Sequence, residues 1–218
     1  MPPSHPPHII PKHRALHLMG WLVFLILALG WGLHALAIPS RAQTPTYTLY
    51  LPLVAREVKA CESLSPQEQA ILDHLLKDPE QSHKSLTCND ILQRVARERA
   101  LDMGLRNYFD HVTPEGYGPN YLVRQAGYPL PSWYSQSVDA NNIESIAYYA
   151  ASPTPDWHDV VEKVWNSWMQ SDSHRSHLLG LTDFYAAQTE FGIGYANVPG
   201  AGWEYRSYWV VIIAQRGP

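Results

Sequence analysis

Three shortages in the sequence exclude whole classes of protein. Only two of the 218 residues are cysteine, so the chain is neither a disulfide-dense miniprotein nor a zinc module with several cysteine ligands. Lysine and arginine number 16 against 20 acidic residues, so the net charge of −4 leaves no basic excess for nucleic acid. Charged residues make up 17% of the chain, below the roughly 25% of an average soluble protein, and 45% are hydrophobic. We therefore expect a folded chain, without a nucleic-acid partner, of about one domain with additions.

Several catalytic motifs are missing as well. The sequence holds no G-x-S-x-G elbow, no Walker loop, no H-E-x-x-H and no EF-hand loop. An exported hydrolase with a Cys–His pair would need a free thiol, which a disulfide between the two cysteines would remove. The sequence therefore gives no sign of an enzyme built on a local nucleophile motif.

Residues 1–37 contain no acidic side chain and have the pattern of a secretory signal peptide. Lys12 and Arg14 precede a long apolar run, and residues 35–37 (ALA) supply a small-residue cleavage site. The alternative is an uncleaved N-terminal anchor, because residues 16–38 are long enough to cross a hydrocarbon core of ~30 Å. In both cases we expect a secreted or extracytoplasmic protein, which contacts a membrane only if the segment is retained. Residues 38–60, rich in proline and threonine, have the composition of a linker.

Three helices are expected in the remaining part, residues 61–218. A capping box at residues 65–68 opens a helix that ends near Lys77. A second helix begins at residues 87–90 and runs to about Asn107, and a third follows Pro155 with a wide apolar stripe. The glycines and prolines of residues 116–142 predict an irregular segment between them.

The C-terminal part changes to the period of a β-strand. Residues 191–196 alternate, residues 197–202 supply turn residues, and residues 203–215 form a long β-rich run. This pattern predicts an antiparallel hairpin. Helices followed by a hairpin predict an α+β fold in which helices pack on a small antiparallel sheet.

Cys61 and Cys88 flank the first expected helix. In an oxidising compartment two cysteines pair by default, and a loop of this length predicts about 3–4 kcal/mol of stabilisation. The alternatives are a reactive thiol and a lipidated Cys61, since residues 58–61 (VKAC) faintly resemble a lipidation box.

Three polar residues stand where a site could form, although each alone is as well explained by structure. They are His111 after the second helix, Glu144 between apolar neighbours, and His174 at the end of the third helix. Five ordered segments around them resemble the bacterial branch of the CAP superfamily, the cysteine-rich secretory proteins, antigen 5 and pathogenesis-related 1, also called SCP domains. The segments are FDHVTPEG (109–116), NYLVRQAGY (120–128), NIESIA (142–147), VWNSWMQSDSHRSHLL (164–179) and TEFGIGYA (189–196).

This resemblance implies an α-β-α sandwich with a cleft lined by histidines and glutamates. His111 matches the family's first cleft histidine. Glu144 matches the glutamate of its G-E-N-I-A motif, and His174 matches the histidine of its S-x-G-H-R motif. The family's second cleft glutamate has no clear equivalent in this sequence.

The sequence also departs from the family motifs. Ile143 and Ser145 replace the Gly and Asn of G-E-N-I-A, so the support of the glutamate is expected to differ. Ser173 replaces the Gly of S-x-G-H-R, and His177 stands where bacterial relatives usually have Asn. His177 is therefore a candidate addition to the cleft.

Two imidazoles and a carboxylate are suited to a divalent cation such as Zn²⁺, or to acid–base chemistry. The metal ligands would be His111 and His174, with Glu144 as a direct or water-mediated third ligand. A rival pair is His174 with His177, spaced to share one helical face. Because His111 and His174 lie on different segments and the rival pair supplies only two ligands, the metal is an optional cofactor in this interpretation.

Three further charged residues are interpreted as scaffolding. Arg99 falls on the apolar stripe of the second helix and is expected to pair or to extend to solvent. Glu190 is expected to pair with Arg175 or another nearby cation.

The resemblance implies an exported CAP-domain protein whose cleft binds a small lipid-like or cell-envelope ligand. Two alternatives stay open: a metal-assisted, protease-like hydrolase that uses the same histidines and glutamate, and a structural envelope domain. No catalytic residue is assigned, and the missing nucleophile motifs favour a binding protein over an enzyme. The six tryptophans and 13 tyrosines that follow residue 37 could line a groove for sugar rings or lipids, although most suit a core.

Overall fold

The computed structural model describes residues 60–217 of the chain. The predicted signal peptide or anchor and nearly all of the predicted linker therefore lie outside the described residues. Within residues 60–217, none of the helices combines the length and the apolar character that crossing a membrane requires.

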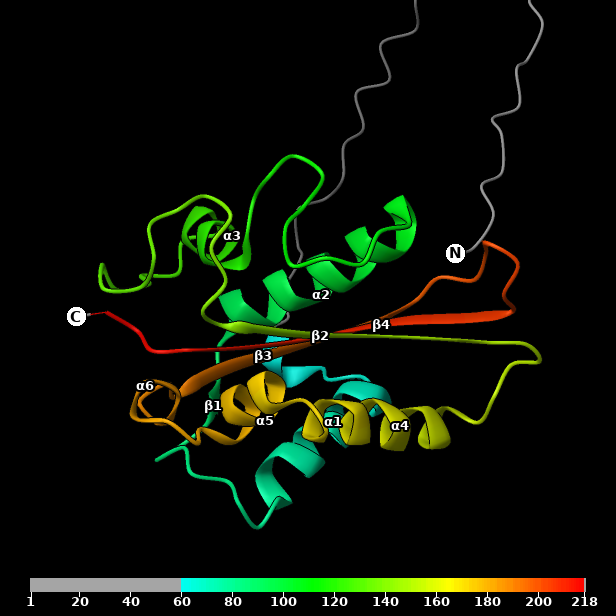
Figure 1. Ribbon diagram of the computed structural model, residues 1–218, viewed down its shortest axis with the longest axis horizontal. Coiled ribbons are helices and arrows are strands. Elements are labelled where there is room, and N and C mark those ends of the chain that lie inside the picture. The colour runs from blue at the N-terminus through cyan, green and yellow to red at the C-terminus, as the bar shows by residue number, and fades with distance from the viewer. Residues whose placement is uncertain (1–59, 218) are drawn as a thin grey trace, which may run out of the picture. The chain divides into compact units, whose positions relative to one another are not determined.

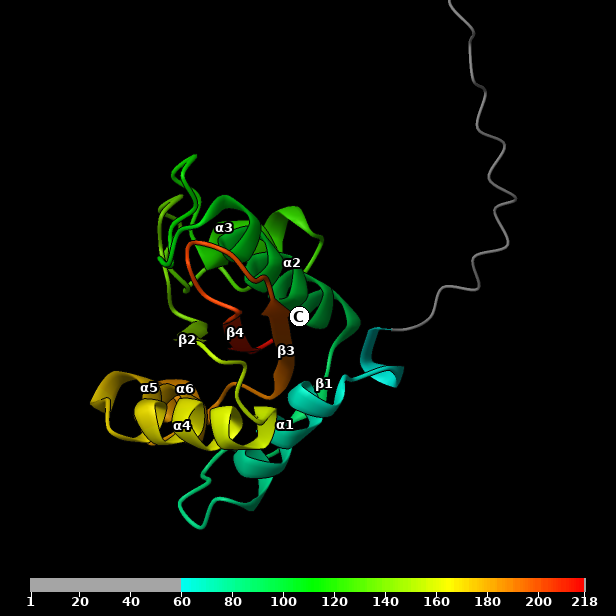
Figure 2. The same cartoon turned by 90° about the vertical axis from the view of Figure 1, so that its right-hand side faces the viewer.

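The described residues form three layers, with a sheet between two layers of helices (Figures 1 and 2). Helices α2 and α3 cover one face of the sheet, and α1, α4, α5 and α6 lie on the other. This arrangement confirms the expected α+β fold and its α-β-α sandwich. In chain order the elements are η1 (Ala60–Glu62), α1 (Pro66–Lys77), β1 (Thr87–Cys88), α2 (Asp90–Arg106), α3 (Pro119–Gln125), β2 (Glu144–Ala151), α4 (Trp157–Met169), α5 (Asp172–Leu179), α6 (Asp183–Ala186), β3 (Glu190–Asn197) and β4 (Tyr205–Ala214).

The sheet has four strands in the order β1-β3-β4-β2. Strands β3 and β4 form the predicted antiparallel hairpin, with Glu190 opposite Ala214. Strand β2 is antiparallel to β4, with Glu144 opposite Ile212, and forms one edge of the sheet. The sheet is mixed rather than wholly antiparallel, because the two-residue β1 pairs in parallel with β3.

Strand β4 joins the two hydrophobic cores. All ten of its residues are buried, and its side chains alternate between the two faces. Trp209 and Val211 belong to the core under α1, α4 and α5, whereas Val210 and Ile212 belong to the core under α2 and α3. A strand covered on both faces accounts for the unbroken apolar run of the sequence here.

Two glycines of β3 allow α2 to pack directly on the sheet. A Cβ atom on Gly192 would lie 2.2 Å from the carbonyl carbon of Leu92, and one on Gly194 would lie 2.1 Å from the carbonyl oxygen of Ala96. Larger residues would therefore push α2 away from the sheet. This contact sets the position of the helix that carries Arg99.

Most expected elements form where the sequence predicts them. The Ser65 hydroxyl accepts from the backbone N–H of Glu68, and the Glu68 carboxylate accepts from the N–H of Ser65, which completes the capping box of α1. Helices α2 and α4 also lie within the expected ranges. Cys61 and Cys88 form the predicted disulfide.

Two expectations about helices are wrong. The segment expected to be irregular contains α3, a seven-residue helix with Pro119 in its first turn, too short to show a clear period. His174 does not end the third helix, because the chain leaves α4 at Gln170 and His174 belongs to the separate helix α5. Strand β2 had no assignment in the sequence interpretation, since its first four residues are buried on both faces and polar and apolar types do not alternate along them.

Candidate functional site

A cleft of about 500 Å³ lies at the free edge of β2, between the two helix layers. Its lining comes from the loop after α2, from β2 itself, and from the junction of α4 and α5. We call this space the cleft; its lining residues are Phe109, Asp110, His111, Ile146, Ala147, Tyr148, Ser167, Trp168, Ser171 and His174.

Glu144 orients His111 at the mouth of the cleft. The Nδ1 atom of His111 lies 3.0 Å from Oε1 of Glu144, whose side chain is fully buried. Because an ionised carboxylate can only accept, Nδ1 carries the hydrogen of this bond. The Nε2 side of the ring is thereby oriented by the carboxylate, as in other carboxylate–histidine pairs.

Arg99 supports this pair from the side of α2. Its Nε atom donates to Glu144 Oε2 at 3.0 Å, and a terminal nitrogen lies 3.2 Å from Oε1. The same terminal nitrogen donates to the backbone carbonyls of Asp110 and His111, at 2.8 and 3.0 Å. One guanidinium therefore fixes both the carboxylate and the loop that presents the imidazole.

The charges of the cleft follow from these contacts. Burial by itself would raise the pKa of Glu144, but the charge of Arg99 and the hydrogen bond from His111 lower it below the usual value. Burial lowers the pKa of His174, and the nearby His111 lowers it further. At neutral pH the cleft thus contains an ionised but paired carboxylate and a neutral His174 ring.

The structure brings the three predicted cleft residues to one place. His111 contacts Glu144 directly, and His174 lines the same cleft from α5. Within the described residues we find no hydrogen bond to the His174 ring, so its nitrogens are available to a ligand. Whether the set binds anything stays a prediction at this point.

His177 is separated from the cleft although it lies only one helical turn from His174. Its ring is 3% exposed and its Nδ1 lies 2.7 Å from the hydroxyl of Ser145. Burial lowers its pKa to about 3. Since it does not line the cleft, neither the pairing of His174 with His177 nor the addition of His177 to the cleft gains support from this placement.

The residues do not fit a metal centre with three side-chain ligands. Both oxygens of Glu144 are already held by Arg99, and one of them also by His111. Among residues 60–217 there is no group of three histidine, cysteine or acidic side chains arranged to hold a metal ion. The cleft therefore offers two imidazoles, fewer ligands than structural or catalytic zinc sites use.

The sequence interpretation missed part of this arrangement. Asn141 accepts from the N–H groups of Ile143 and Glu144 and donates to the Glu144 carbonyl, so it fixes the start of β2. Its amide nitrogen also lies 3.0 Å from Nδ1 of His111; with Nδ1 donating to Glu144, this is a close contact and not a hydrogen bond. The tendency of asparagine to form local turns was the available signal. Arg99 was placed among the pairing residues, but nothing in the sequence named its partner.

Glu190 pairs with a cation, as expected, and the cation is the second of the two alternatives. Glu190 pairs with Arg216, 3.2 Å away, rather than with Arg175. Arg175 pairs with Glu80 instead. Both pairs lie away from the cleft lining.

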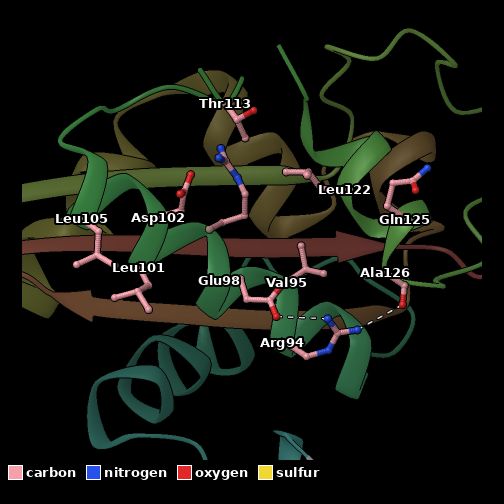
Figure 3. A pocket seen from close by; sticks show the side chains of 11 residues that line it. Arg94, Val95, Glu98, Leu101, Asp102, Leu105, Thr113, Leu122, Gln125 and Ala126 are labelled. Atoms are coloured by element: carbon pink, nitrogen blue, oxygen red, sulfur yellow. Dashed lines mark hydrogen bonds and ion pairs between the residues drawn. The ribbon is translucent and has the colours of Figure 1, made fainter. Parts of the chain in front are cut away.

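A second pocket, of about 520 Å³, lies between α2 and α3 (Figure 3). Leu101 and Leu105 from α2 and Leu122 from α3 give it an apolar lining. Arg94 bonds along α2 to Glu98 and reaches the carbonyl of Ala126 after α3. It contains none of the predicted site residues. We therefore place the candidate site in the cleft, where the imidazoles are, and not in this more apolar groove.

Comparison with known proteins gives one family match and a few distant relatives. The model of the cysteine-rich secretory protein (CAP) family matches residues 79–213, which is more than half of the chain. The uncharacterized protein YkwD of Bacillus subtilis strain 168 is 29% identical over 117 residues, which cover 54% of this chain and 37% of that protein. The match thus spans well under half the length of this relative.

Similar solved structures are more distant. An extracellular protein containing a SCP domain from Bacillus anthracis is 17% identical, with 71% of this chain and 45% of that chain covered and a TM-score of 0.45. An outer surface protein from Borrelia burgdorferi is 16% identical, with 70% and 97% covered and a TM-score of 0.44.

Proposed function

Since the chain belongs to the cysteine-rich secretory protein (CAP) family, we propose that it is an exported binding protein whose cleft holds a small lipid-like or cell-envelope ligand. The observation that carries this proposal is the chain of contacts from Arg99 through Glu144 to His111. It holds one imidazole in a fixed orientation at the mouth of an open cleft, beside a second imidazole from α5. A fixed polar group on a rigid scaffold is what selective binding of a small ligand requires.

The contacts favour binding over hydrolysis. Arg99 holds Glu144 in its ionised form, so this carboxylate is a poor proton donor at neutral pH. Ser167 in the cleft donates to the carbonyl of Val164 rather than to an imidazole. The Ser145–His177 pair has the composition of a nucleophile and a base, but both side chains are buried away from ligand.

Export is the second part of the proposal. The charge pattern of residues 1–37 supports it, and so does the disulfide between Cys61 and Cys88, because such bonds persist in oxidising compartments. Cleavage of the segment would release the protein, and retention would anchor it to a membrane.

Zn²⁺ remains an optional occupant of the cleft in this proposal. With His111 and His174 as the two protein ligands, binding is expected to be weak and to disappear in acid, because imidazole must be neutral to coordinate. Titration calorimetry of the exported chain with Zn²⁺ tests this. We expect His111→Ala and His174→Ala to abolish the heat, and His177→Ala to leave it unchanged.

Photo-crosslinking in cells tests the proposed function without assuming the ligand. A benzoylphenylalanine replaces Phe109 in the cleft or, as the control, Trp133, which is exposed but outside the cleft lining. After irradiation, mass spectrometry of the exported protein is expected to show an envelope-derived adduct at position 109 only, lost when His111→Ala is added. Identical adducts at both positions, or none at position 109, would contradict the proposal.

A further inference from the structure

We propose that the ligand of the cleft is a neutral sugar chain of the cell envelope. This inference rests on the proposed function and names the ligand class of the same site. It follows from which charges, aromatic faces and hydrogen-bonding groups line the cleft, and from which are missing.

The charges disfavour anionic ligands. Asp110 is the one formally charged side chain among the residues that line the cleft. The nearest buried cation, Arg99, is 3% exposed and is neutralised by Glu144. A phosphate group or a fatty-acid carboxylate would therefore meet an acidic side chain and no free cation in the described lining. This argues against anionic lipid headgroups and phosphate polymers.

Two exposed aromatic rings form a platform beside the imidazoles. The side chains of Phe109 and Tyr148 are 50% and 40% exposed, and their ring centroids lie 5.9 Å apart. Tyr148 also packs on Tyr208, with the centroids 5.1 Å apart, which steadies its ring. Exposed rings of this kind match the apolar face of a sugar ring, whereas an acyl chain needs an enclosed apolar channel.

The polar groups around the platform suit hydroxyl groups. The rings of His111 and His174 both line the cleft, and imidazole nitrogens can donate or accept. The Ser167 hydroxyl donates its hydrogen to the Val164 carbonyl and keeps its lone pairs, and Ser171 lines the cleft where α4 passes into α5. Neutral donors and acceptors near apolar faces complement a sugar, whose hydroxyls need both.

A peptide is the less suitable alternative even though β2 is an edge strand. An extended peptide would pair with the free backbone groups of β2. Within the cleft, however, the indole Nε1 of Trp168 already donates to the carbonyl of Ile146 at 2.9 Å. The edge therefore lacks an uninterrupted row of acceptors at the point where the imidazoles lie.

The test uses the exported chain and three neutral tetrasaccharides, of N-acetylglucosamine, glucose and mannose, in titration calorimetry. The anionic tetrasaccharide of galacturonic acid serves as the charged counterpart, because the described lining offers Asp110 and no free cation. We expect at least one neutral tetrasaccharide to bind, and more tightly than the anionic one. Phe109→Ala and Tyr148→Ala should each weaken binding about 3- to 10-fold, because each removes one aromatic contact. Trp133→Ala, at a ring that is 61% exposed and lies outside the cleft lining, should change nothing, and unchanged circular dichroism checks the fold.

The outcomes separate this inference from the proposed function. If no neutral tetrasaccharide binds and the adduct at position 109 is a lipid or a peptide, the sugar inference is wrong and the cleft-binding function stands. If no adduct specific to position 109 forms, the binding function falls as well. Tighter binding of the anionic tetrasaccharide, or an equal loss with Trp133→Ala, would also overturn the sugar inference.

Discussion

Helix α2 carries two ion pairs of the same chemistry, two positions apart. Arg97 holds Glu68, with Nε–Oε1 and Nη2–Oε2 distances of 2.8 and 2.6 Å. Arg99 holds Glu144 at 3.0 and 3.2 Å. Both carboxylates are buried, and both pairs use two nitrogens of one guanidinium.

The pairs differ in what else the carboxylate binds. Glu68 also accepts from the backbone of Ser65, so the first pair ties the start of α1 to α2. Glu144 also accepts from His111, so the second pair reaches the cleft. Residues two apart on a helix point to nearly opposite sides, which sends one arginine to each neighbour. The same kind of ion pair therefore stabilises the packing of two helices in one place and supports the candidate site in the other.

Removing Arg99 is expected to have the largest effect of any change at the two pairs. Arg99→Met leaves Glu144 buried without a partner, which costs about 3–5 kcal/mol of unfolding free energy. Urea denaturation measures the loss. The double variant Arg99→Met with Glu144→Leu is expected to recover most of the stability but not the binding of ligand, because His111 loses its orienting carboxylate. A loss below about 1 kcal/mol for Arg99→Met would contradict the role given to this pair.

Removing Arg97 is expected to cost less. The Arg97 side chain is 30% exposed, so water can partly replace it at Glu68, and Arg97→Met should cost about 1–2 kcal/mol in the same urea experiment. Ligand binding by the cleft should remain as in the unmodified protein. Loss of binding with Arg97→Met would show that the two pairs are not independent.

Acid is expected to lower the unfolding free energy through the Arg99–Glu144 pair. The pKa of Glu144 is lowered in the folded protein, so its stabilising contribution is present above its ordinary value of 4.5 and is lost as the pH falls through the folded value. Unfolding free energy measured from pH 7 to pH 3 should therefore fall less steeply below pH 4.5 in Glu144→Gln than in the unmodified protein. Equal slopes would contradict the ion pair.

Protonation of His177 causes a separate loss of folding stability in acid. Burial lowers its pKa to about 3, from an ordinary 6.5. Between these values the unfolded chain binds a proton that the folded chain does not, so stability declines as the pH falls from 6.5 towards 3. Both proteins in the comparison retain His177, so a difference between their slopes belongs to Glu144.

The smallest effects are expected at the residue that each carboxylate contacts besides its arginine, which is Ser65 for Glu68 and His111 for Glu144. Ser65→Ala removes the N-cap of α1 and should cost about 1 kcal/mol. His111→Ala should change the unfolding free energy by less than about 0.5 kcal/mol, because a part-exposed cleft side chain contributes little packing. Thermal unfolding of the two variants checks this. A larger loss with His111→Ala than with Ser65→Ala would indicate that His111 is part of the scaffold.

Local signals along the sequence predicted α1, α2, α4, the hairpin and the disulfide. Each of these depends on a cap, a period or a cysteine pair that is visible within a short stretch of chain. The three cleft residues were predicted through the family resemblance, and the structure places His111, Glu144 and His174 around one cleft. Helix α3 lacked a visible period because it has only seven residues.

What only the tertiary structure decided was the set of partners. Arg99 and Glu144 are 45 positions apart, and their contact depends on how closely Gly192 and Gly194 let α2 approach the sheet. In the same way, the side of α5 that meets the sheet buries His177 beside Ser145 and leaves His174 in the cleft. Sequence periodicity reports which face of a helix is apolar, but packing between distant segments determines which buried charge meets which partner.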